Sequence, residues 1–461
     1  MNNVFSMKDH DVFADSLKGK KILFATFPAD GHFNPLTGLA VYLKNTGCDV
    51  RWYTSRIYTE KLQKLDIHHY WFKKALEAHS DNFDILFPER NKIKGQVRKL
   101  KFDMVNAFIL RSPEYYADLA EIHKSFPFEL VIADCAFTAI PFVKEKMNIP
   151  VISIGVFPLT ETSRDLPPVG LGMTPSYTFF GRIKQALLRA ITRRLIFGEP
   201  NRVMWALLNK YDIPHEHESV FDMLIKKSNL LLQSGTPGFE YKRSDLGENI
   251  RFIGALLPFS PGRKKIPWFD VRLTQYRKIV LVTQGTVEKD PEKIIVPALE
   301  AYKNTDTLIV ATTGGSKTHE LRKRYPYQNI IIEDFIPFGD IMPYADIYIT
   351  NGGYGGVMLS IENELPMIVA GVHEGKNEIN ARIGYFKLGI DLKTERPKSR
   401  QIKESVEKLL KDKIYKENVI KLAKDLRNYD PNELCADYAA MILQKTGGLY
   451  PKPKRKKEKV Y

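Results

Sequence analysis

Cysteine is scarce in this chain: there are three in 461 residues, Cys48, Cys135 and Cys435, far apart in the sequence. Disulfide frameworks and cysteine-based zinc sites need several cysteines at short, regular spacings. The sequence therefore excludes a disulfide-stapled secreted fold. It predicts a protein of a reducing compartment, the cytoplasm.

Long apolar runs are also missing, since no stretch approaches the ~18 residues that a membrane-spanning helix requires. The first 21 residues carry Asp9, Asp11 and Asp15, where a secretory signal would have a basic start and an apolar core. Histidines and carboxylates are not grouped at metal-ligand spacing. We therefore expect no signal peptide, no transmembrane span, no bound metal and no cofactor.

The composition is that of a globular protein, with 44% hydrophobic and 27% charged residues. A chain of this length exceeds one typical hydrophobic core, so two domains are expected.

The net charge is +15, and part of it lies in the last ten residues, which contain Lys452, Lys454, Arg455, Lys456, Lys457 and Lys459. Such a run is either a solvated tail or a contact with an anionic membrane, which would place the protein at its inner face. Nucleic acid is not expected as a partner, because aromatic and basic residues do not alternate as in RNA-binding proteins.

Two series of short apolar runs alternate with helical patterns. The first series begins with an apolar run, Lys21–Thr26, which predicts a strand. A helical periodicity of apolar residues follows and ends at Leu43, and Val50–Tyr53 predicts the next strand. Together they predict a βαβ unit. The second restarts at Ile279–Thr283, after a segment rich in proline and glycine. We predict an α/β fold of two Rossmann-like, doubly wound domains that face a cleft. The expected parts are an N-terminal domain (1–240), a linker (241–275), a C-terminal domain (276–430) and a basic tail (447–461).

A glycine-rich turn stands at the centre of the second series. The β-branched run Ile347–Thr350 predicts a buried strand, four glycines follow within 351–356, and Val357–Glu364 can form a helix. A strand, a glycine-rich turn and a helix aim free backbone N–H groups at a phosphate. The alternative is a tight turn with no ligand.

Three stretches together resemble the donor-binding motif of the family 1 glycosyltransferases, the UDP-glycosyltransferase superfamily, in its bacterial natural-product form. They are Thr350-Asn351-Gly352-Gly353-Tyr354-Gly355-Gly356, Glu364-Leu365-Pro366 and Lys376-Asn377-Glu378-Ile379-Asn380-Ala381. The family has Thr-His-Gly-Gly-x-Gly-Ser, Gly-Val-Pro and Asp/Glu-Gln-x-x-Asn-Ala at matching spacing. The resemblance covers most of residues 20–446. It implies the GT-B fold, in which the N-terminal domain (1–240) binds the acceptor and the C-terminal domain (276–430) binds the nucleotide sugar. The last helix of this fold, here expected at 431–446, packs back on the first domain.

The chain departs from the family pattern where the donor is bound. Asn351 replaces the histidine that the family uses on the diphosphate, and Gly356 replaces the serine. Lys376 and Asn377 replace the acid–amide pair that holds the sugar hydroxyls. The resemblance also assigns Gly352, Gly353, Tyr354 and Gly355 to the nucleotide-sugar site. We expect backbone amides to hold the diphosphate more than side chains do.

Two residues at strand ends of the first series are the candidate catalytic groups. His32 lies in Gly31-His32-Phe33-Asn34-Pro35, after the first strand, and Asp134 ends the strand Leu130–Ala133. The first stretch resembles the family's Gly-His-x-x-Pro pattern, which implies that His32 is the general base and Asp134 its supporting carboxylate. Imidazole suits this role because its ordinary pKa lies near neutral pH. The alternatives are a surface or helix-capping histidine, and an aspartate that caps a helix starting at Ala136.

Two more loops resemble donor contacts of the family. Thr283-Gln284-Gly285-Thr286 is similar to a Ser-x-Gly-Ser/Thr loop, which implies that Gly285 and Thr286 contact the diphosphate. Phe335-Ile336-Pro337-Phe338 is similar to a Trp-x-Pro-Gln segment, which implies that Phe335 stacks on uracil beside Ile336. Glu374, Lys376 and Asn377 lie at the positions where the family binds the sugar hydroxyls. The alternatives are an ordinary turn for Gly285 and Thr286, core packing for the phenylalanines, and solvated charge for Glu374 and Lys376.

The resemblance implies an inverting hexosyltransferase that works without metal. The expected donor is UDP-glucose, and the expected acceptor is a hydroxyl of a small lipophilic molecule. Two alternatives stay open: a glycolipid-forming transferase at a membrane surface, and a non-catalytic sugar-nucleotide-binding protein, prompted by Asn351. Retention of both His32 and Asp134 favours an enzyme over the latter.

Overall fold

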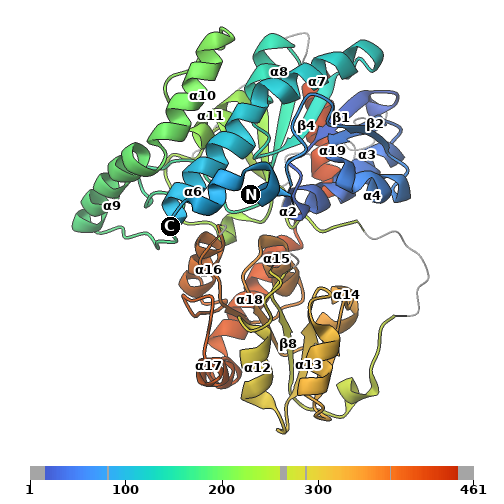
Figure 1. Cartoon of the computed structure of the whole chain (residues 1–461), viewed down its shortest axis with the longest axis vertical. Helices are drawn as coiled ribbons and strands as arrows, with labels where there is room; N and C mark the ends of the chain where they lie inside the picture. Colours follow the sequence, from blue (N-terminus) through green and yellow to red (C-terminus); the bar gives the residue numbers. More distant parts are fainter. Residues whose placement is uncertain (1–15, 80–81, 260–266, 286–287, 374, 445–461) are drawn as a thin grey trace.

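The structure, a computed structural model, describes residues 16–79, 82–259, 267–285, 288–373 and 375–444. The predictions that concern Thr286, Glu374 and the tail 447–461 lie outside these residues. Within them the chain forms two α/β halves, one above the other in Figure 1.

The N-terminal half is built on a seven-stranded parallel sheet in the order β3-β2-β1-β4-β5-β6-β7. Two of its inner strands, β4 and β5, are buried along their whole length and mostly apolar, as expected where helices cover both faces of a sheet. The strands are β1 (Lys21–Ala25), β2 (Asp49–Thr54), β3 (His68–Trp71), β4 (Leu130–Asp134), β5 (Val151–Gly155), β6 (Leu230–Gln233) and β7 (Ile250–Phe252).

The C-terminal half has a six-stranded parallel sheet in the order β10-β9-β8-β11-β12-β13. Valine and isoleucine dominate its strands and fill a core on each face. The strands are β8 (Ile279–Thr283), β9 (Leu308–Thr312), β10 (Ile330–Glu333), β11 (Ile347–Thr350), β12 (Met367–Val369) and β13 (Gly389–Asp391).

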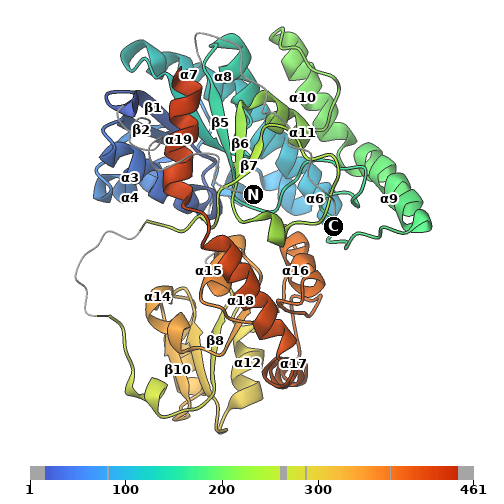
Figure 2. The same cartoon turned by 180° about the vertical axis from the view of Figure 1, so that it is seen from behind.

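Helices connect the strands and cover both sheets (Figures 1 and 2). Those of the N-terminal half are α2 (Asp30–Phe33), α3 (Thr37–Asn45), α4 (Thr59–Lys64), α5 (Phe83–Leu86), α6 (Gln96–Asp103), α7 (Ser112–Ser125), α8 (Ile140–Lys146), α9 (Phe179–Ile191), α10 (Gly198–Lys210) and α11 (Val220–Lys227). Those that follow are α12 (Ile295–Tyr302), α13 (Thr318–Arg324), α14 (Phe338–Ile341), α15 (Tyr354–Glu362), α16 (Lys376–Tyr385), α17 (Ser399–Lys411), α18 (Ile414–Leu426) and α19 (Pro431–Gln444).

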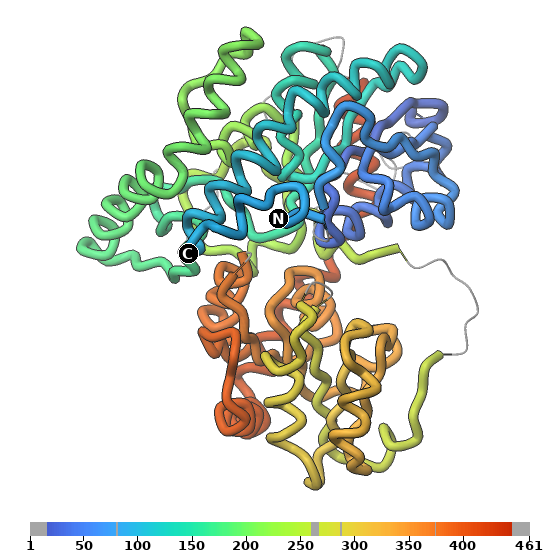
Figure 3. The backbone as a smooth tube through the Cα atoms, viewed as in Figure 1, coloured from blue at the N-terminus to red at the C-terminus, as the bar shows by residue number. Residues whose placement is uncertain are grey.

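The chain passes to the second half between β7 and β8 and returns between α18 and α19 (Figure 3). Helix α19 lies against α3, and its Cys435, Ala439 and Ile442 are buried in the core of the N-terminal half. In the other direction, Phe239, which follows β6, is buried in the core of the C-terminal half. Each half therefore completes part of its core with residues from the other end of the chain.

Two of the three free thiols lie in this packed interior. Cys48 and Cys435 are buried and Cys135 is partly exposed. Burial raises the pKa of Cys48 to about 11 and that of Cys435 to about 12. Burial, with the neighbouring Asp134, also raises the pKa of Cys135.

Two segments differ from the prediction. The range 241–275, expected as a linker, contains β7, which pairs with β6 and closes one edge of the N-terminal sheet. The sequence of 187–208 also predicts one helix. The structure has α9, which starts at Phe179, then a π-helical turn, η6 (Thr192–Ile196), and then α10. Among the helices of the described ranges, none combines the length and apolar character needed to cross a bilayer.

Candidate active site

In a doubly wound parallel sheet, ligands bind beside the carboxyl ends of the strands, at the point where the strand order reverses. In the N-terminal half this point lies between β1 and its neighbour β4. The loop after β1 leads into α2, which carries His32, and β4 ends at Asp134. The fold thus brings both predicted catalytic residues to the same edge of the sheet.

The two side chains form a direct hydrogen bond. His32 Nδ1 lies 2.7 Å from Asp134 Oδ1. The backbone N–H of Phe27 donates to Asp134 Oδ2 at 2.7 Å, and that of Ala136 donates to Oδ1 at 2.8 Å. The Asp134 side chain has no exposed surface, whereas that of His32 is 19% exposed. Three donors therefore fix a buried carboxylate, and this carboxylate orients the ring with the proton on Nδ1 and the lone pair of Nε2 free to accept another.

The capping alternative for Asp134 is correct in part. The carboxylate accepts the amide of Ala136, as a cap would, but the helix that follows begins at Ile140 and not at Ala136. Orienting His32 and shaping this turn are therefore two roles of one carboxylate.

Aromatic rings surround His32, and the sequence reasoning missed them. The rings of Phe27 and Phe157 meet the imidazole edge-on, with centroids 5.7 and 6.0 Å away. Phe108 stacks on Phe27 at 4.2 Å. Phe27 follows β1 closely and Phe157 follows β5, so their position at strand ends was the available signal. The site presents an apolar wall beside a polar base.

In the C-terminal half the strand order reverses between β8 and β11. Gly285 follows β8 with a positive φ of 79°, and Asn351 follows β11. The Asn351 side chain is buried: Nδ2 donates to the Gln284 carbonyl, and Oδ1 accepts the Gly353 N–H at 3.3 Å. This side chain joins the two turns to each other.

The glycines after Asn351 differ in what they permit. A Cβ at Gly352 would lie 1.8 Å from Asn380 Oδ1, and φ there is +87°, so the fold itself requires glycine. At Gly353, the N-cap of α15, a Cβ would meet nothing closer than 3.8 Å, and at Gly355 nothing within 4 Å. A Cβ at Gly356 would lie 3.1 Å from the Tyr348 hydroxyl. The first turn of α15 therefore has open space beside its N–H groups, where the helix dipole favours an anion.

Tyr354 was predicted as part of the nucleotide-sugar site, but its side chain points to the other half. It is buried, and its hydroxyl donates to the Ser234 carbonyl, beyond the end of β6, at 2.8 Å. Burial and the charge of Glu240 raise the pKa of Tyr354. This bond holds the N-terminus of α15 against the strand ends of the N-terminal half.

The predicted base-stacking segment divides into an exposed and a buried residue. Phe335 is 69% exposed, and its ring lies near Gly315. Ile336 is buried in the core, so only its backbone can reach a ligand. The ring of Phe335 is the part of this segment that offers a flat face.

Helix α16 carries Lys376 as its first residue, partly buried, and Asn377 as its second. Asn377 Nδ2 donates to the Gly170 carbonyl at 2.8 Å, so its amide contacts a loop of the N-terminal half and not open space. Glu378, which the sequence reasoning passed over, accepts the N–H groups of Gly170 and Gly172 at 2.8 Å each. The irregular stretch before α9 is thus attached to the helix that carries the predicted sugar-binding residues.

A buried ion pair supports this attachment. Arg382 Nη2 lies 2.9 Å from Glu240 Oε2, and Nη1 lies 3.1 Å from Glu378 Oε2. Glu240 Oε1 also accepts the N–H of Leu159 at 2.8 Å. The side chains of Arg382 and Glu240 are 3% and 6% exposed. The guanidinium therefore neutralises two carboxylates at the junction of the halves.

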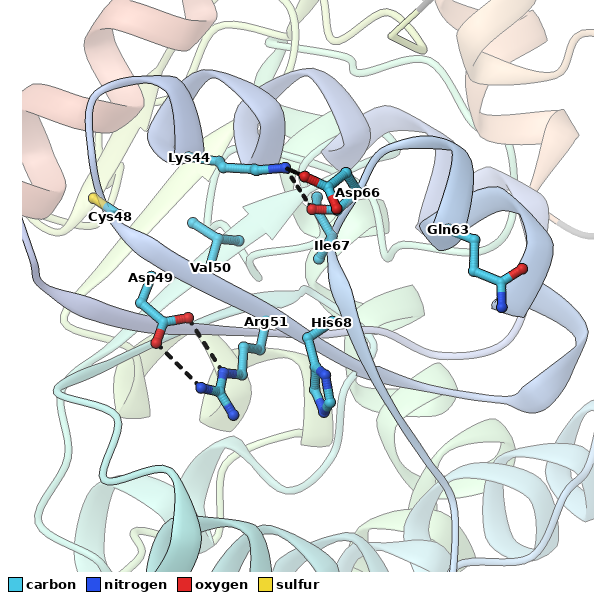
Figure 4. Close-up of a pocket in the computed structure, with 9 residues that line it drawn as sticks. All are labelled: Lys44, Cys48, Asp49, Val50, Arg51, Gln63, Asp66, Ile67 and His68. Carbon is cyan, nitrogen blue, oxygen red and sulfur yellow. Dashed lines mark hydrogen bonds and ion pairs between the residues drawn. The ribbon is translucent and has the colours of Figure 1, made fainter.

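A hollow of about 520 Å³ lies elsewhere, at the edge of the sheet beside β2 (Figure 4). Lys44 is paired with Asp66 there, and Arg51 with Asp49. None of the predicted site residues lines it. Its charges are already matched, so we place no chemistry there. The described residues hold no group of histidine, cysteine and carboxylate side chains suited to a metal ion.

Comparison with known proteins assigns the family. Residues 297–441 match the family described as "Erythromycin biosynthesis protein CIII-like, C-terminal domain". The chain is 30% identical over 404 residues to the 4'-demethylrebeccamycin synthase of Lentzea aerocolonigenes, covering 88% of this chain and 95% of that protein. It is 27% identical over 425 residues to UDP-glucosyltransferase 1 of Beauveria bassiana, covering 87% and 90%.

The fold agrees with this assignment. The crystal structure of CalG4, the calicheamicin glycosyltransferase, superposes with a TM-score of 0.70 at 17% identity, over 93% of this chain and 99% of that one. The predicted resemblance is therefore confirmed. The protein belongs to the family 1 glycosyltransferases, enzymes that transfer a sugar from a nucleotide sugar to a small acceptor, and its two parallel sheets form their GT-B fold.

Proposed function

We propose that the protein transfers glucose from UDP-glucose, with inversion, to a hydroxyl of a small lipophilic natural product. One observation carries the proposal: His32 and Asp134 occupy the switch point of one sheet, and the open N-terminus of α15 follows the switch point of the other. The Tyr354–Ser234 hydrogen bond holds these two edges together.

The chemistry follows from these positions. The acceptor O–H proton passes to His32 Nε2 as the acceptor oxygen bonds to the anomeric carbon. The bond from that carbon to the diphosphate breaks in the same step, and a single displacement inverts the configuration. The nucleoside diphosphate leaves with negative charge, which the N–H groups and dipole of α15 stabilise. Asp134 stabilises the imidazolium and keeps its orientation.

Other residues select the substrates in this proposal. The exposed face of Phe335 stacks on the base, and the turns at Gly285 and Thr286 and at 351–356 hold the diphosphate. Lys376 and Glu374 read the sugar hydroxyls, because the Asn377 amide is already engaged with Gly170. Phe27, Phe108 and Phe157 favour an apolar acceptor. The glucosyltransferase relative from Beauveria bassiana supports glucose as the sugar.

The test is a panel of UDP- and dTDP-sugars against phenolic, alcoholic and lipid acceptors, read by mass spectrometry, with the product linkage determined by NMR. We expect a β-glucoside from UDP-glucose and a small apolar acceptor. Retained configuration would overturn the displacement step. Turnover only with dTDP-sugars would overturn the donor assignment, and a preference for lipid acceptors would overturn the acceptor class.

Substitutions in the glycine-rich turn test how the diphosphate is held. Gly353→Val should weaken UDP binding by about tenfold or more, since its methyl groups would enter the space beside the α15 N–H groups. Asn351→Ala should weaken it far less, because the side chain bonds the protein backbone and its loss frees the Gly353 N–H.

Calorimetry with UDP measures both variants. The control is Gly339→Val, at an exposed glycine of the same half that also has nothing within 4 Å, and it should bind UDP normally. If Asn351→Ala weakened UDP binding more than Gly353→Val, the diphosphate would be held by the Asn351 side chain and not by the backbone N–H groups.

A further inference from the structure

An apolar stripe runs along the outside of α9 and η6. Phe180 is 81% exposed and Leu187 is 61% exposed. The exposed apolar side chains along this segment are Phe179, Phe180, Ile183, Leu187, Ile191 and Leu195. Five of these six recur at every fourth position, so they lie on one side of the helix. Soluble helices turn such a stripe inward, and this one faces out.

The opposite side of α9 is held by polar contacts. Gln185 is buried, with Oε1 accepting the N–H of Ser176 and Nε2 donating to the Asp165 carbonyl. Thr192 is buried on η6. The orientation of the helix is therefore fixed by its inner face, and the exposed stripe is not needed to keep it in place.

The charged residues of α9 and η6 are all positive. Residues 166–198 contain no aspartate or glutamate, whereas Arg182, Lys184, Arg189, Arg193 and Arg194 lie in α9 and η6. None of the five makes an ion pair within the part of the chain that the structure describes. Arg189 lies one turn beyond the buried Gln185 and donates to the Leu166 carbonyl, and Arg193 donates to the His217 carbonyl. The cations that flank the stripe are therefore Arg182, Lys184 and Arg194. Exposed apolar residues flanked by cations are the pattern of helices that lie in the interface of an anionic membrane.

The position of α9 fits a flat partner. In Figures 1 and 2 the helix projects from the side of the N-terminal half that is opposite α3 and α4. The helix therefore lies at the periphery of the N-terminal half.

We infer that the outer face of α9 and η6 docks on anionic lipid bilayers. The apolar side chains enter the interfacial region, and Arg182, Lys184 and Arg194 meet the headgroups. A second copy of the chain fits this face less well, because a two-fold contact through it would bring the same three cations against themselves. The inference concerns a surface outside the active site and does not depend on the proposed donor or acceptor.

The test uses the full-length protein and flotation with vesicles of phosphatidylcholine, with and without phosphatidylglycerol. We expect binding to the mixed vesicles alone. Replacing Phe180, Ile183 and Leu187 together by glutamine should lower the partition coefficient by about tenfold or more. The control replaces Phe269, Val271 and Leu410, exposed apolar residues of the other half, by glutamine and should change it by less than about twofold. Undiminished flotation of the α9 variant would overturn the inference.

A second measurement separates α9 from the basic tail. In Phe180→Trp, the introduced indole should be quenched by brominated lipid in mixed vesicles, whereas Phe269→Trp should give no added quenching over the wild type. Bound protein whose Trp at position 180 is not quenched would assign the membrane contact to another segment and overturn the inference. Sedimentation velocity that shows self-association lost in the glutamine variant, without vesicle binding by the wild type, would also overturn it and identify a contact between copies.

Discussion

Replacing His32 by alanine is expected to lower kcat on an aliphatic alcohol acceptor by about 10²- to 10⁴-fold, the usual contribution of a general base. The reason is geometric: Asp134 holds Nδ1 at 2.7 Å, which leaves Nε2 as the acceptor of the substrate proton. UDP affinity should not change, because the nucleotide is assigned to the other half. A phenol of low pKa should lose less, since it is partly ionised without help.

Two further variants make this result specific. His319→Ala removes an exposed histidine of the C-terminal half and should leave kcat within about twofold. Asp134→Asn should keep the fold and lose less than His32→Ala, because the ring remains but its tautomer and the imidazolium are no longer supported. Steady-state kinetics with an alcohol and a phenol measure all of these. A near-normal kcat of His32→Ala on the alcohol would show that His32 and Asp134 are not the general base and its support.

Replacing Arg382 by methionine is expected to lower the free energy of unfolding by about 3–5 kcal/mol, the typical cost of leaving a buried charge without its partner. Arg382 is 3% exposed and faces the carboxylates of Glu240 and Glu378. Methionine fills similar space but leaves both carboxylates buried and unpaired. Urea unfolding followed by circular dichroism measures the loss.

The matched control is an exposed pair, Arg400 and Glu404, one helical turn apart on α17, with side chains 87% and 61% exposed. Arg400→Met should cost less than about 1 kcal/mol, because solvent screens such pairs. In the double variant Arg382→Met, Glu240→Gln, one unpaired charge is gone, so part of the loss should be recovered. Equal, small effects of Arg382→Met and Arg400→Met would show that the buried pair does not stabilise the fold.

The pair of His32 and Asp134 could be predicted because each residue is marked by its own local sequence pattern. His32 and Asp134 each follow a clear apolar strand, and parallel strands align their carboxyl ends. Three strands gave no such signal. β3 is an edge strand with the sequence His-His-Tyr-Trp, and β7 and β13 have three residues each. Pairing with a neighbour defines these strands, and their own residue patterns are too short to show it.

The side-chain hydrogen bonds and ion pairs between the halves could not be predicted from the sequence for a related reason. Glu240 and Arg382 are 142 residues apart, and Glu378 and Gly170 are 208 apart. Nothing near Glu378 distinguishes it from a solvated helix residue. Tyr354 illustrates the same limit: the motif placed it correctly at the start of α15, but which way the ring turns depends on the other half.

The raised pKa values of the three thiols have a practical consequence for following the motion of this enzyme. A thiol reacts with maleimide as its thiolate, and burial keeps the pKa of Cys48 at about 11 and that of Cys435 at about 12, with that of Cys135 also raised. At neutral pH the native cysteines therefore react only slowly with such reagents. A pair of cysteines introduced at exposed positions, one in each half, will take donor and acceptor fluorophores without removal of the native ones. The distance between the halves can then be followed in single molecules through a catalytic cycle.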